Sequence, residues 1–277
     1  TDSLGPHTVP DHYEIHFHSE DLSGELSFEV EQWAPSVETL IWVKVPSIPA
    51  SSGPLSPSPT RFYMYYDYDS PLPISVHDDN VWSEDFLGVW HLAETDGATY
   101  EDSTSGNHDG GLFGNTETFT APTPEPDAGR IGVAQRWDDE TDGIAVPPIS
   151  GDDLGPFTVS LWMYVNDMPS NHGRLFDKGW AGHGSNEGFF ARIHNDDLYY
   201  RIHSDSDDEE DHRELRFSTD VGKGSWVWWT FIYDGDFVLD SDPPFPTGGQ
   251  VFRNAESLSG ELVNDDPDDD AEYNGDA

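Results

Sequence analysis

The stretch Phe157–Val165, FTVSLWMYV, decides the fold class, because apolar residues occupy every second position along it. A period of two is the pattern of a β-strand that has one face in a hydrophobic core. The segment Leu26–Val30 alternates in the same way. Trp226–Tyr233 is apolar or aromatic on both faces apart from Thr230, which predicts a central strand.

Short strand-like segments make up most of the remaining chain, and helical periodicity is almost absent. Gly and Pro clusters separate these segments, as expected for an all-β sandwich. The further segments are Leu40–Val45, Arg61–Tyr68, Phe86–Leu92, Gly143–Val146, Arg174–Asp177, Phe189–His194, Leu198–His203 and Leu215–Ser218. A length of 277 residues suits one large β domain or two smaller units, with the most natural boundary near residues 71–79.

Acidic residues outnumber basic ones 55 to 12, which gives the chain a formal charge of −43. Such a charge pushes a compact state apart unless salt screens it, and the screening length falls from roughly 8 Å at 0.15 M salt to roughly 3 Å at 1 M. The 10 Trp, 11 Tyr and 15 Phe argue against a disordered acidic chain, which typically has few aromatic residues. We therefore expect a folded protein of a halophilic archaeon, or of a virus that infects one.

The composition also narrows the classes of partner and chemistry. Without cysteine the chain cannot form disulfides, thiolate nucleophiles or zinc–thiolate sites. No apolar stretch approaches the roughly 18 residues that span a bilayer, so we expect no membrane insertion of this segment. The acidic balance argues against nucleic acid as a partner, because phosphates would meet an anionic surface.

Two sets of motifs, in order along the chain, resemble known families. Leu26–Trp33 (LSFEVEQW), Ile41–Ser47 (IWVKVPS) and Phe62–Tyr66 (FYMYY) resemble the second half of the domain of unknown function 2341. The motifs that follow resemble the laminin-G-like, concanavalin A-like jelly roll, and they are Val89–Leu92 (VWHL), Asp102–Gly110 (DSTSGNHDG), Gly129–Trp137 (GRIGVAQRW) and Phe157–Trp162 (FTVSLW).

The resemblance implies a partial β module in residues 1–79 and a laminin-G-like jelly-roll domain in residues 80–277. The first family occurs in archaeal and bacterial surface proteins, so we expect an extracellular location, on a cell or virion surface. The upstream strands of that family are not evident, nor is a closing jelly-roll strand of the form G-x-I-D-E-V-R-I. We therefore expect a fragment of a larger surface protein, with the jelly roll lacking its last strand or strands.

A calcium site is a further expectation. In jelly-roll relatives the D-S-x-x-G-N turn and the turn after G-x-A-x-x-F/W lie close together and can hold Ca²⁺, which by resemblance makes Asp102, Asn107 and Asp138 candidate ligands. The residues themselves show D-x-E-x-D-G at Asp138, Glu140 and Asp142, much like the start of a calcium loop. The acid at the twelfth position of an EF-hand is missing. The alternatives are two ordinary hairpin turns, or loose occupancy by Na⁺ or K⁺.

The clearest surface signal is a hairpin at residues 189–203, in which FFARIH and LYYRIH flank a short polar turn. With Asp196 and Asp197 in the turn, Arg192 would face Arg201, and all the polar groups would share one face. The side chains on that face would be Phe190, Arg192, His194, Tyr199, Arg201 and His203. Arg offers forked donors and Tyr a stacking surface, so the patch is suited to a carboxylated or sulfated glycan. The alternative is that nearby acids, for instance those in 205–211, neutralise it.

Tryptophan is the other candidate for sugar contact. Trp180 lies in the Gly-rich loop KGWAGHGSN, where it is a candidate platform for a sugar ring. Core packing explains most of the tryptophans in strand-like runs, which are Trp33, Trp42, Trp82, Trp90, Trp162, Trp226, Trp228 and Trp229.

No catalytic constellation is evident, so we expect no enzymatic activity. The sequence lacks a strand of the form E-x-D-x-x-E, a G-x-S-x-G elbow and an H-E-x-x-H zinc motif. Glu29 and Glu31 share a strand face, and a solvated acidic face is the simplest interpretation in a chain with 55 acids. His91 lies among apolar neighbours and is interpreted as a structural, hydrogen-bonded histidine.

These observations favour a non-catalytic adhesion module that binds a surface glycan or neighbouring surface proteins. Two alternatives stay open: a structural building block of a pilus, sheath or viral fibre, and an accessory domain of a polysaccharide hydrolase. The charge of −43 is interpreted as an adaptation to the solvent, with the Arg192/Arg201 patch as the exception to it.

Overall fold

The structure is a computed structural model in which the described residues form β-strands joined by turns and loops, and the all-β prediction is confirmed. The described residues are 13–33, 38–49, 60–68, 80–82, 85–112, 119–125, 128–139, 141–149, 155–167, 173–178, 188–194, 196–203, 212–218, 220–235 and 249–263. No helix in these ranges is long and apolar enough to cross a membrane. The chain packs as two compact units, Thr1–Ile149 and Ser150–Ala277.

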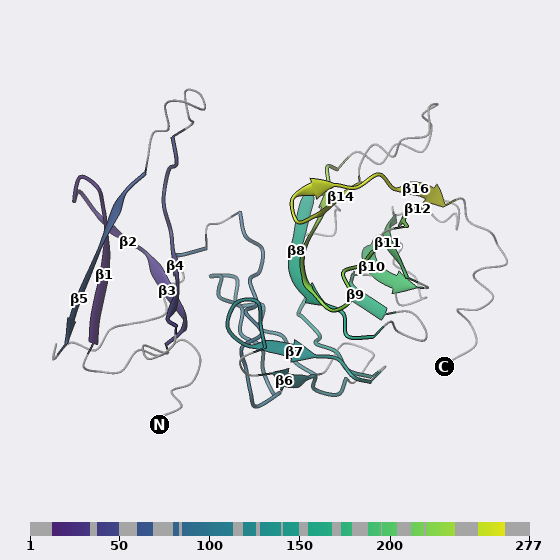
Figure 1. The fold of residues 1–277 in the computed structure, drawn as a ribbon, viewed down its shortest axis with the longest axis horizontal. Helices are drawn as coiled ribbons and strands as arrows, with labels where there is room; N and C mark the ends of the chain where they lie inside the picture. The colour runs from purple at the N-terminus through teal and green to yellow at the C-terminus, as the bar shows by residue number, and fades with distance from the viewer. Residues whose placement is uncertain are drawn as a thin grey trace. The chain divides into compact units, whose positions relative to one another are not determined.

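The described strands of the first unit form three small antiparallel sheets (Figure 1). β1 lies between β2 and β5, while β3 pairs with β4 and β6 with β7. The strands are β1 (Tyr13–Ser19), β2 (Glu25–Leu26), β3 (Phe28–Gln32), β4 (Leu40–Val43), β5 (Phe62–Tyr68), β6 (Thr123–Glu125) and β7 (Ala134–Arg136). Apolar residues of the first three strands form a core, and they are Ile15, Phe17, Leu26, Phe28 and Val30.

The described strands of the second unit form two antiparallel sheets, and β8 and β14 face β9, β10 and β11 across its interior (Figure 1). One sheet has the order β15-β14-β13-β8 and the other the order β16-β12-β11-β10-β9. The strands are β8 (Phe157–Tyr164), β9 (Gly173–Lys178), β10 (Gly188–His194), β11 (Asp197–His203), β12 (His212–Phe217), β13 (Trp226–Tyr233), β14 (Gly249–Arg253), β15 (Glu256–Ser257) and β16 (Glu261–Val263).

The core of the second unit lies between these two sheets, as the alternation in β8 and β13 predicts. Every second residue of β13 is buried, including Trp229 and Phe231 at 0% exposure. The Phe231 ring lies 5.0 Å from that of Phe176 in β9 and 5.4 Å from that of Tyr200 in β11, measured between centroids. Because strand side chains alternate, the other half of β8 and β13 points away from this core.

Some segments differ from the predicted strands. Only isolated bridges form in Phe86–Leu92 and Gly143–Val146, which were predicted as strands. Backbone N–H groups in and near these segments donate to the side chains of Asp102 and Asp142. β14, β15 and β16 follow Tyr233 and were not predicted, since they are short and contain polar residues.

The predicted domain boundary at residues 79/80 adjoins a segment outside the described residues. Described residues on its two sides pack together in the first unit, where the indole N–H of Trp82 donates to Glu29 at 2.8 Å. The assignment of residues 1–79 to a module of their own stays a prediction.

Candidate functional site

The predicted arginine hairpin forms, with a register two residues away from the predicted one. Arg192 lies opposite Tyr199, and His194 lies opposite Asp197. Two residues remain between the strands, and Asp196 has a φ of 69°, as two-residue hairpin turns require. A shift of two residues keeps every side chain on its face. The predicted pairing is therefore wrong, and the predicted faces are confirmed.

Arg192 and Arg201 share a counter-ion, Glu214 of β12, instead of forming an exposed patch. Arg201 Nε lies 2.8 Å from Glu214 Oε2, and Arg192 Nη2 lies 3.3 Å from Glu214 Oε1. The exposed fractions of Arg192, Arg201 and Glu214 are 6%, 5% and 4%. The prediction of a surface arginine patch is wrong, because all three side chains are buried. A nearby acid neutralises both arginines, as the alternative interpretation proposed, although it is Glu214 and not an acid of residues 205–211.

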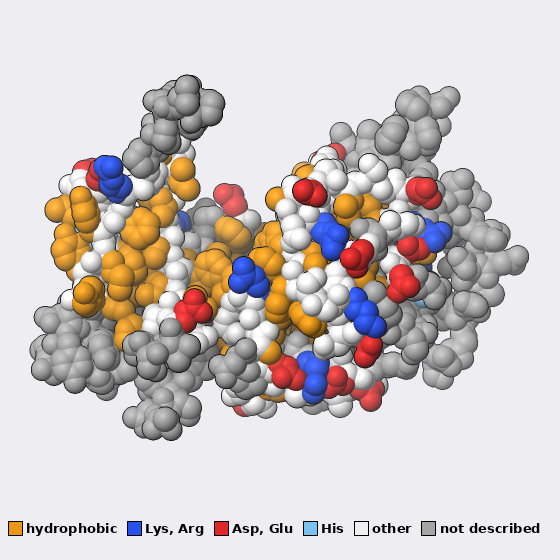
Figure 2. Space-filling view, in the orientation of Figure 1, with side chains coloured by type: hydrophobic (Ala, Val, Ile, Leu, Met, Phe, Trp, Pro, Cys, Tyr) orange, Lys and Arg blue, Asp and Glu red, His pale blue; other side chains and the backbone are white. Residues whose placement is uncertain are grey.

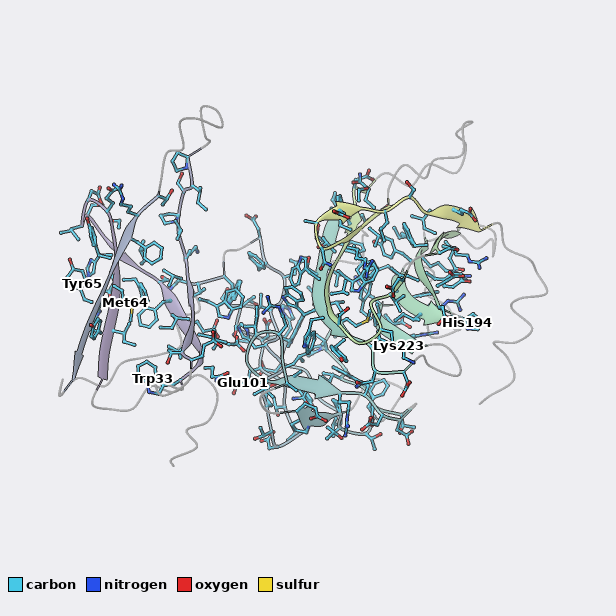
Figure 3. All side chains as sticks on the ribbon, viewed as in Figure 1. Trp33, Met64, Tyr65, Glu101, His194 and Lys223 are labelled. Carbon is cyan, nitrogen blue, oxygen red and sulfur yellow. The ribbon has the colours of Figure 1, made fainter. Side chains whose placement is uncertain are left out.

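The other residues of the predicted glycan site are placed as follows. The Arg192 guanidinium lies 4.9 Å from the centroid of the Tyr199 ring, and His194, labelled in Figure 3, makes an edge contact with Tyr199 at 6.3 Å. The His203 side chain and Trp180 lie outside the described residues. A ligand-binding role for this group of residues stays a prediction.

The outer face of the opposite sheet carries aromatic pairs. Trp162 of β8 lies opposite Trp228 of β13, with ring centroids 5.3 Å apart. Tyr164, which is 41% exposed, lies opposite Trp226 at 5.6 Å. Core packing explains Trp229, as predicted. It does not explain Trp162, Trp226 and Trp228, because the alternation along the strands points them outward.

A shallow, largely open pocket of about 370 Å³ lies beside the Trp162–Trp228 pair, and Asn254 completes its lining. Asn254 and Ala255 form the turn between β14 and β15, with φ values of 50° and 67°. Asn254 Oδ1 accepts a hydrogen bond from the Trp228 N–H at 3.0 Å, and the Asn254 N–H donates to the Trp228 carbonyl at 2.8 Å. A positive φ at alanine is strained, so the turn holds an uncommon backbone beside the pocket.

No charged side chain lies at the outward strand positions of β8, β13 and β14, all of which the structure describes, and we call these positions together with Asn254 the aromatic face. The strand registers give its members as Thr158, Ser160, Trp162, Tyr164, Trp226, Trp228, Thr230, Ile232, Gln250, Phe252 and Asn254. The Ser160 hydroxyl donates to Thr230 Oγ1 at 3.2 Å. Since 24% of the chain is charged, an uncharged face of this extent is a strong departure from its composition.

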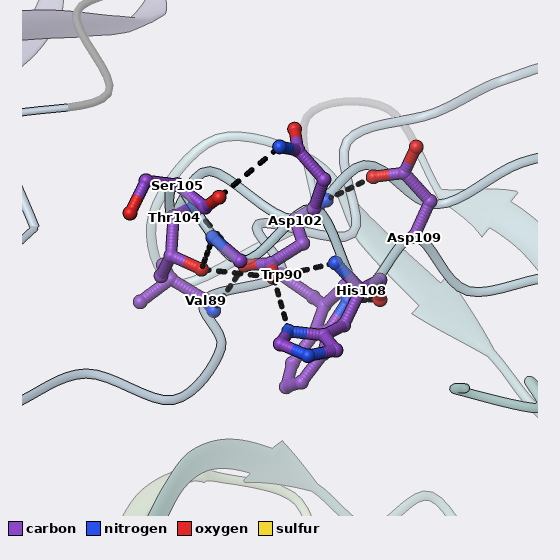
Figure 4. Close-up of polar contacts among 9 residues, drawn as sticks. Val89, Trp90, Asp102, Thr104, Ser105, His108 and Asp109 are labelled. Atoms are coloured by element: carbon purple, nitrogen blue, oxygen red, sulfur yellow. Dashed lines mark hydrogen bonds and ion pairs between the residues drawn. The ribbon is translucent and has the colours of Figure 1, made fainter. Parts of the chain in front are cut away.

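Asp102, a predicted calcium ligand, holds its own turn together (Figure 4). Its Oδ1 accepts the backbone N–H of Val89 at 2.9 Å and that of Thr104 at 3.0 Å. Its Oδ2 accepts the Thr104 hydroxyl and the His108 N–H, both at 2.9 Å. Burial alone would raise the pKa of Asp102, but these hydrogen bonds hold it below its usual range. A cation at Asp102 would have to displace donors that organise the turn.

The other described calcium candidates also lie in turns and form hydrogen bonds within them. Asn107 has a φ of 51°, and its side chain donates within the same turn as Asp102. Asp142 Oδ2 accepts the N–H of Asp138 at 2.8 Å, while Glu140 lies outside the described residues. Where the structure describes the chain, no three His, Asp or Glu side chains form a group that could hold a metal. The calcium site therefore stays a prediction.

A buried ionic cluster in the first unit joins β3 to the segment around His91. The Glu29 and Glu31 residues are 1% and 4% exposed. His91 Nδ1 lies 2.5 Å from Glu31 Oε2, and His91 Nε2 lies 3.3 Å from Glu29 Oε2. Trp42 and Trp82 donate their indole N–H groups to Glu31 and Glu29, each at 2.8 Å. The solvated-face interpretation of the two glutamates is wrong, whereas the His91 side chain is largely buried and hydrogen-bonded, as predicted.

The groups in this cluster stabilise one another's charged forms. Burial alone would lower the pKa of His91, but its contacts with Glu29 and Glu31 raise it to about 9. Burial alone would raise the pKa of Glu29, but His91, with Ser103 and Trp82 as further donors, lowers it to about 2. A buried ion pair needs such surrounding donors to offset its desolvation. The cluster therefore holds His91 and Glu29 together in their charged forms inside the first unit.

The comparisons with known proteins concern mainly the second unit. Residues 138–241 match the laminin G family model described as the Concanavalin A-like lectin/glucanases superfamily. The chain matches no curated protein and no solved structure. Residues 138–241 are therefore similar to this superfamily, and the same part of the chain contains two antiparallel sheets that face each other.

Proposed function

We propose that the chain is a non-catalytic glycan-binding module, and that the aromatic face is its binding surface. The observation that carries the proposal is the absence of charge from that face, within the described residues, in a chain with a formal charge of −43. A surface that serves only solubility in salt would be acidic, as the rest of the composition is. The superfamily match supports a carbohydrate ligand.

Aromatic side chains and neutral hydrogen-bonding groups are the chemistry that an uncharged sugar needs. The Trp162 and Trp228 rings offer apolar surfaces on which the C–H faces of a pyranose can stack. Asn254 Oδ1 is engaged with the Trp228 backbone, which leaves the Nδ2 amide to donate to a sugar hydroxyl. Ligand sites combine apolar surface with a few fixed polar groups in this way.

The Tyr164–Trp226 pair extends the same surface along the strands. Residues two apart on one face of a strand are separated by roughly 6.6 Å, so Trp226 and Trp228 can contact successive parts of an extended ligand. The preferred ligand is therefore an uncharged oligosaccharide or polysaccharide rather than a monosaccharide. The aromatic face offers no basic side chain that could pair with an anionic glycan.

The setting that we propose is extracellular, on the surface of a halophilic cell or of a virion. Bulk salt screens the acidic chain there, while stacking against an uncharged face depends little on ionic strength. Binding through such a face keeps its affinity in salt that would abolish recognition by ion pairs. This difference favours the aromatic face over the arginine hairpin as the glycan site.

Calorimetric titration of the full chain with neutral and anionic polysaccharides tests the proposal. The Trp228→Ala chain should bind a neutral glycan about tenfold more weakly, equivalent to about 1.4 kcal/mol. Trp137→Ala is the matched control, because Trp137 is 48% exposed and lies in the first unit. Equal losses in both variants, or wild-type binding to anionic glycans only, would contradict the proposal.

A further inference from the structure

The edge strand β5 exposes an unusual amount of apolar surface. Among the described residues it pairs only with β1, which leaves its other edge without a strand partner. Five consecutive large side chains of β5 are between 44% and 78% exposed, and they are Phe62, Tyr63, Met64, Tyr65 and Tyr66. Figure 2 shows hydrophobic side chains gathered over this sheet, and Figure 3 labels Met64 and Tyr65 on it.

Edge strands usually carry protection against pairing with another chain. Charged side chains, prolines, bulges and short length are the common devices. Residues 62–66 contain no charge and no proline, and β5 pairs with β1 over seven residues without a bulge. In a chain of net charge −43, this uncharged strand is suited to association rather than to contact with solvent.

The sequence of β5 is complementary to itself in the antiparallel direction. If Met64 lies on a two-fold axis, Phe62 of one copy faces Tyr66 of the other, and Tyr63 faces Tyr65. Arg61 lies just before the strand, 3.2 Å from Glu20 of its own chain, and in this register it comes opposite position 67 of the other copy. A two-fold interface requires this kind of self-complementary surface.

The same register is consistent with the faces of the sheet. Phe62, Met64 and Tyr66 lie on the core side with Phe17, since they pair in register with β1 residues of that side. Tyr63 and Tyr65 lie on the other side, where Tyr65 contacts His18 at 5.5 Å. Because each pair in the proposed register joins residues of the same face, the core side would continue from one copy into the next.

We propose that β5 pairs antiparallel with β5 of a second copy of this chain, which joins two three-stranded sheets into one. The pairing would satisfy the open backbone edge and shield part of the exposed aromatic surface from water. This interaction surface lies in the first unit and is independent of the glycan-binding proposal.

Single cysteines test the register directly, because the chain contains no cysteine of its own. Met64→Cys should cross-link two copies rapidly under mild oxidation, since facing residues of an antiparallel pair have Cα atoms about 5 Å apart. Phe62→Cys alone should not, because its counterpart would lie roughly 13 Å along the strand. A mixture of Phe62→Cys and Tyr66→Cys chains should cross-link as hybrid dimers.

Sedimentation of the cysteine-free chain at about 100 µM supplies the second measurement, because self-association depends on concentration. The wild type should sediment as a dimer, and Arg61→Asp should shift it toward monomer by placing acids opposite each other. Combining Arg61→Asp with Asp67→Arg should restore the dimer. A monomeric wild type, or equal cross-linking rates for Met64→Cys, Phe62→Cys and an exposed Trp137→Cys control, would overturn the proposal.

Discussion

The stability of the first unit should fall as the pH rises through about 9, because His91 then loses its charge between Glu29 and Glu31. The folded-state pKa of about 9 lies above the ordinary value of 6.5. A raised pKa contributes stability that is fully present below about pH 6.5 and is lost as the pH climbs through about 9. This difference between the two pKa values of His91 corresponds to about 3 kcal/mol of unfolding free energy.

The predicted loss of stability depends on deprotonation of His91 alone. A variant of this residue therefore separates it from the effects of high pH on the rest of the chain. His91→Gln keeps polar contacts with the glutamates but cannot ionise. It should be less stable than the wild type at about pH 6 and should lack the extra loss of stability toward about pH 10. The rings of Trp42 and Trp82 lie 5.9 and 5.8 Å from the imidazole, so their fluorescence reports on the cluster.

Urea unfolding at several pH values and constant high salt is the assay, with an NMR titration of His91 beside it. The reasoning predicts a wild-type midpoint that drops on the alkaline side and a His91 resonance that titrates well above its ordinary range. An unperturbed His91 titration, or an identical pH profile for His91→Gln, would refute it.

Three other perturbations follow from the structure. Glu214→Gln leaves Arg192 and Arg201 buried without their shared carboxylate, and should cost about 3 to 5 kcal/mol in urea unfolding of the second unit. Asp102→Ala removes the acceptor of four hydrogen bonds, so hydrogen exchange should show loss of protection at residues 102–108, with or without added Ca²⁺. Dialysis of the whole chain below roughly 0.5 M salt should abolish its far-UV strand spectrum, because screening of the −43 charge weakens; an unchanged spectrum would contradict that explanation of the charge.

Local patterns predicted those features of the fold that depend on local sequence. The alternation in Phe157–Tyr164 and Trp226–Tyr233 fixes their core faces, and the structure places Trp229 and Phe231 accordingly. In the hairpin at residues 189–203, the side chains lie on the predicted faces although the register differs by two residues. The reason is that side chains along a strand return to the same face every two residues. Turn length, which fixes the register, was ambiguous in a run of three polar residues.

Features that depend on distant partners were not predictable in this way. The burial of Glu29 depends on Trp82 and Ser103, which are 53 and 74 residues further along the chain. The partner of Arg192 and Arg201 comes from a third strand, which the hairpin sequence does not reveal. The aromatic face was missed because a strand with aromatic residues on both faces looks like a fully buried strand. The uncharged even-numbered positions of β8 were the available signal.

The most direct test of the glycan-binding account is an NMR titration of the tryptophan indole N–H resonances with a neutral oligosaccharide in high salt. The account predicts saturable shifts for Trp162 and Trp228, smaller shifts for Trp226, and none for the core residue Trp229. Shifts confined to indoles outside the aromatic face, or no saturable shift with any neutral glycan, would contradict it.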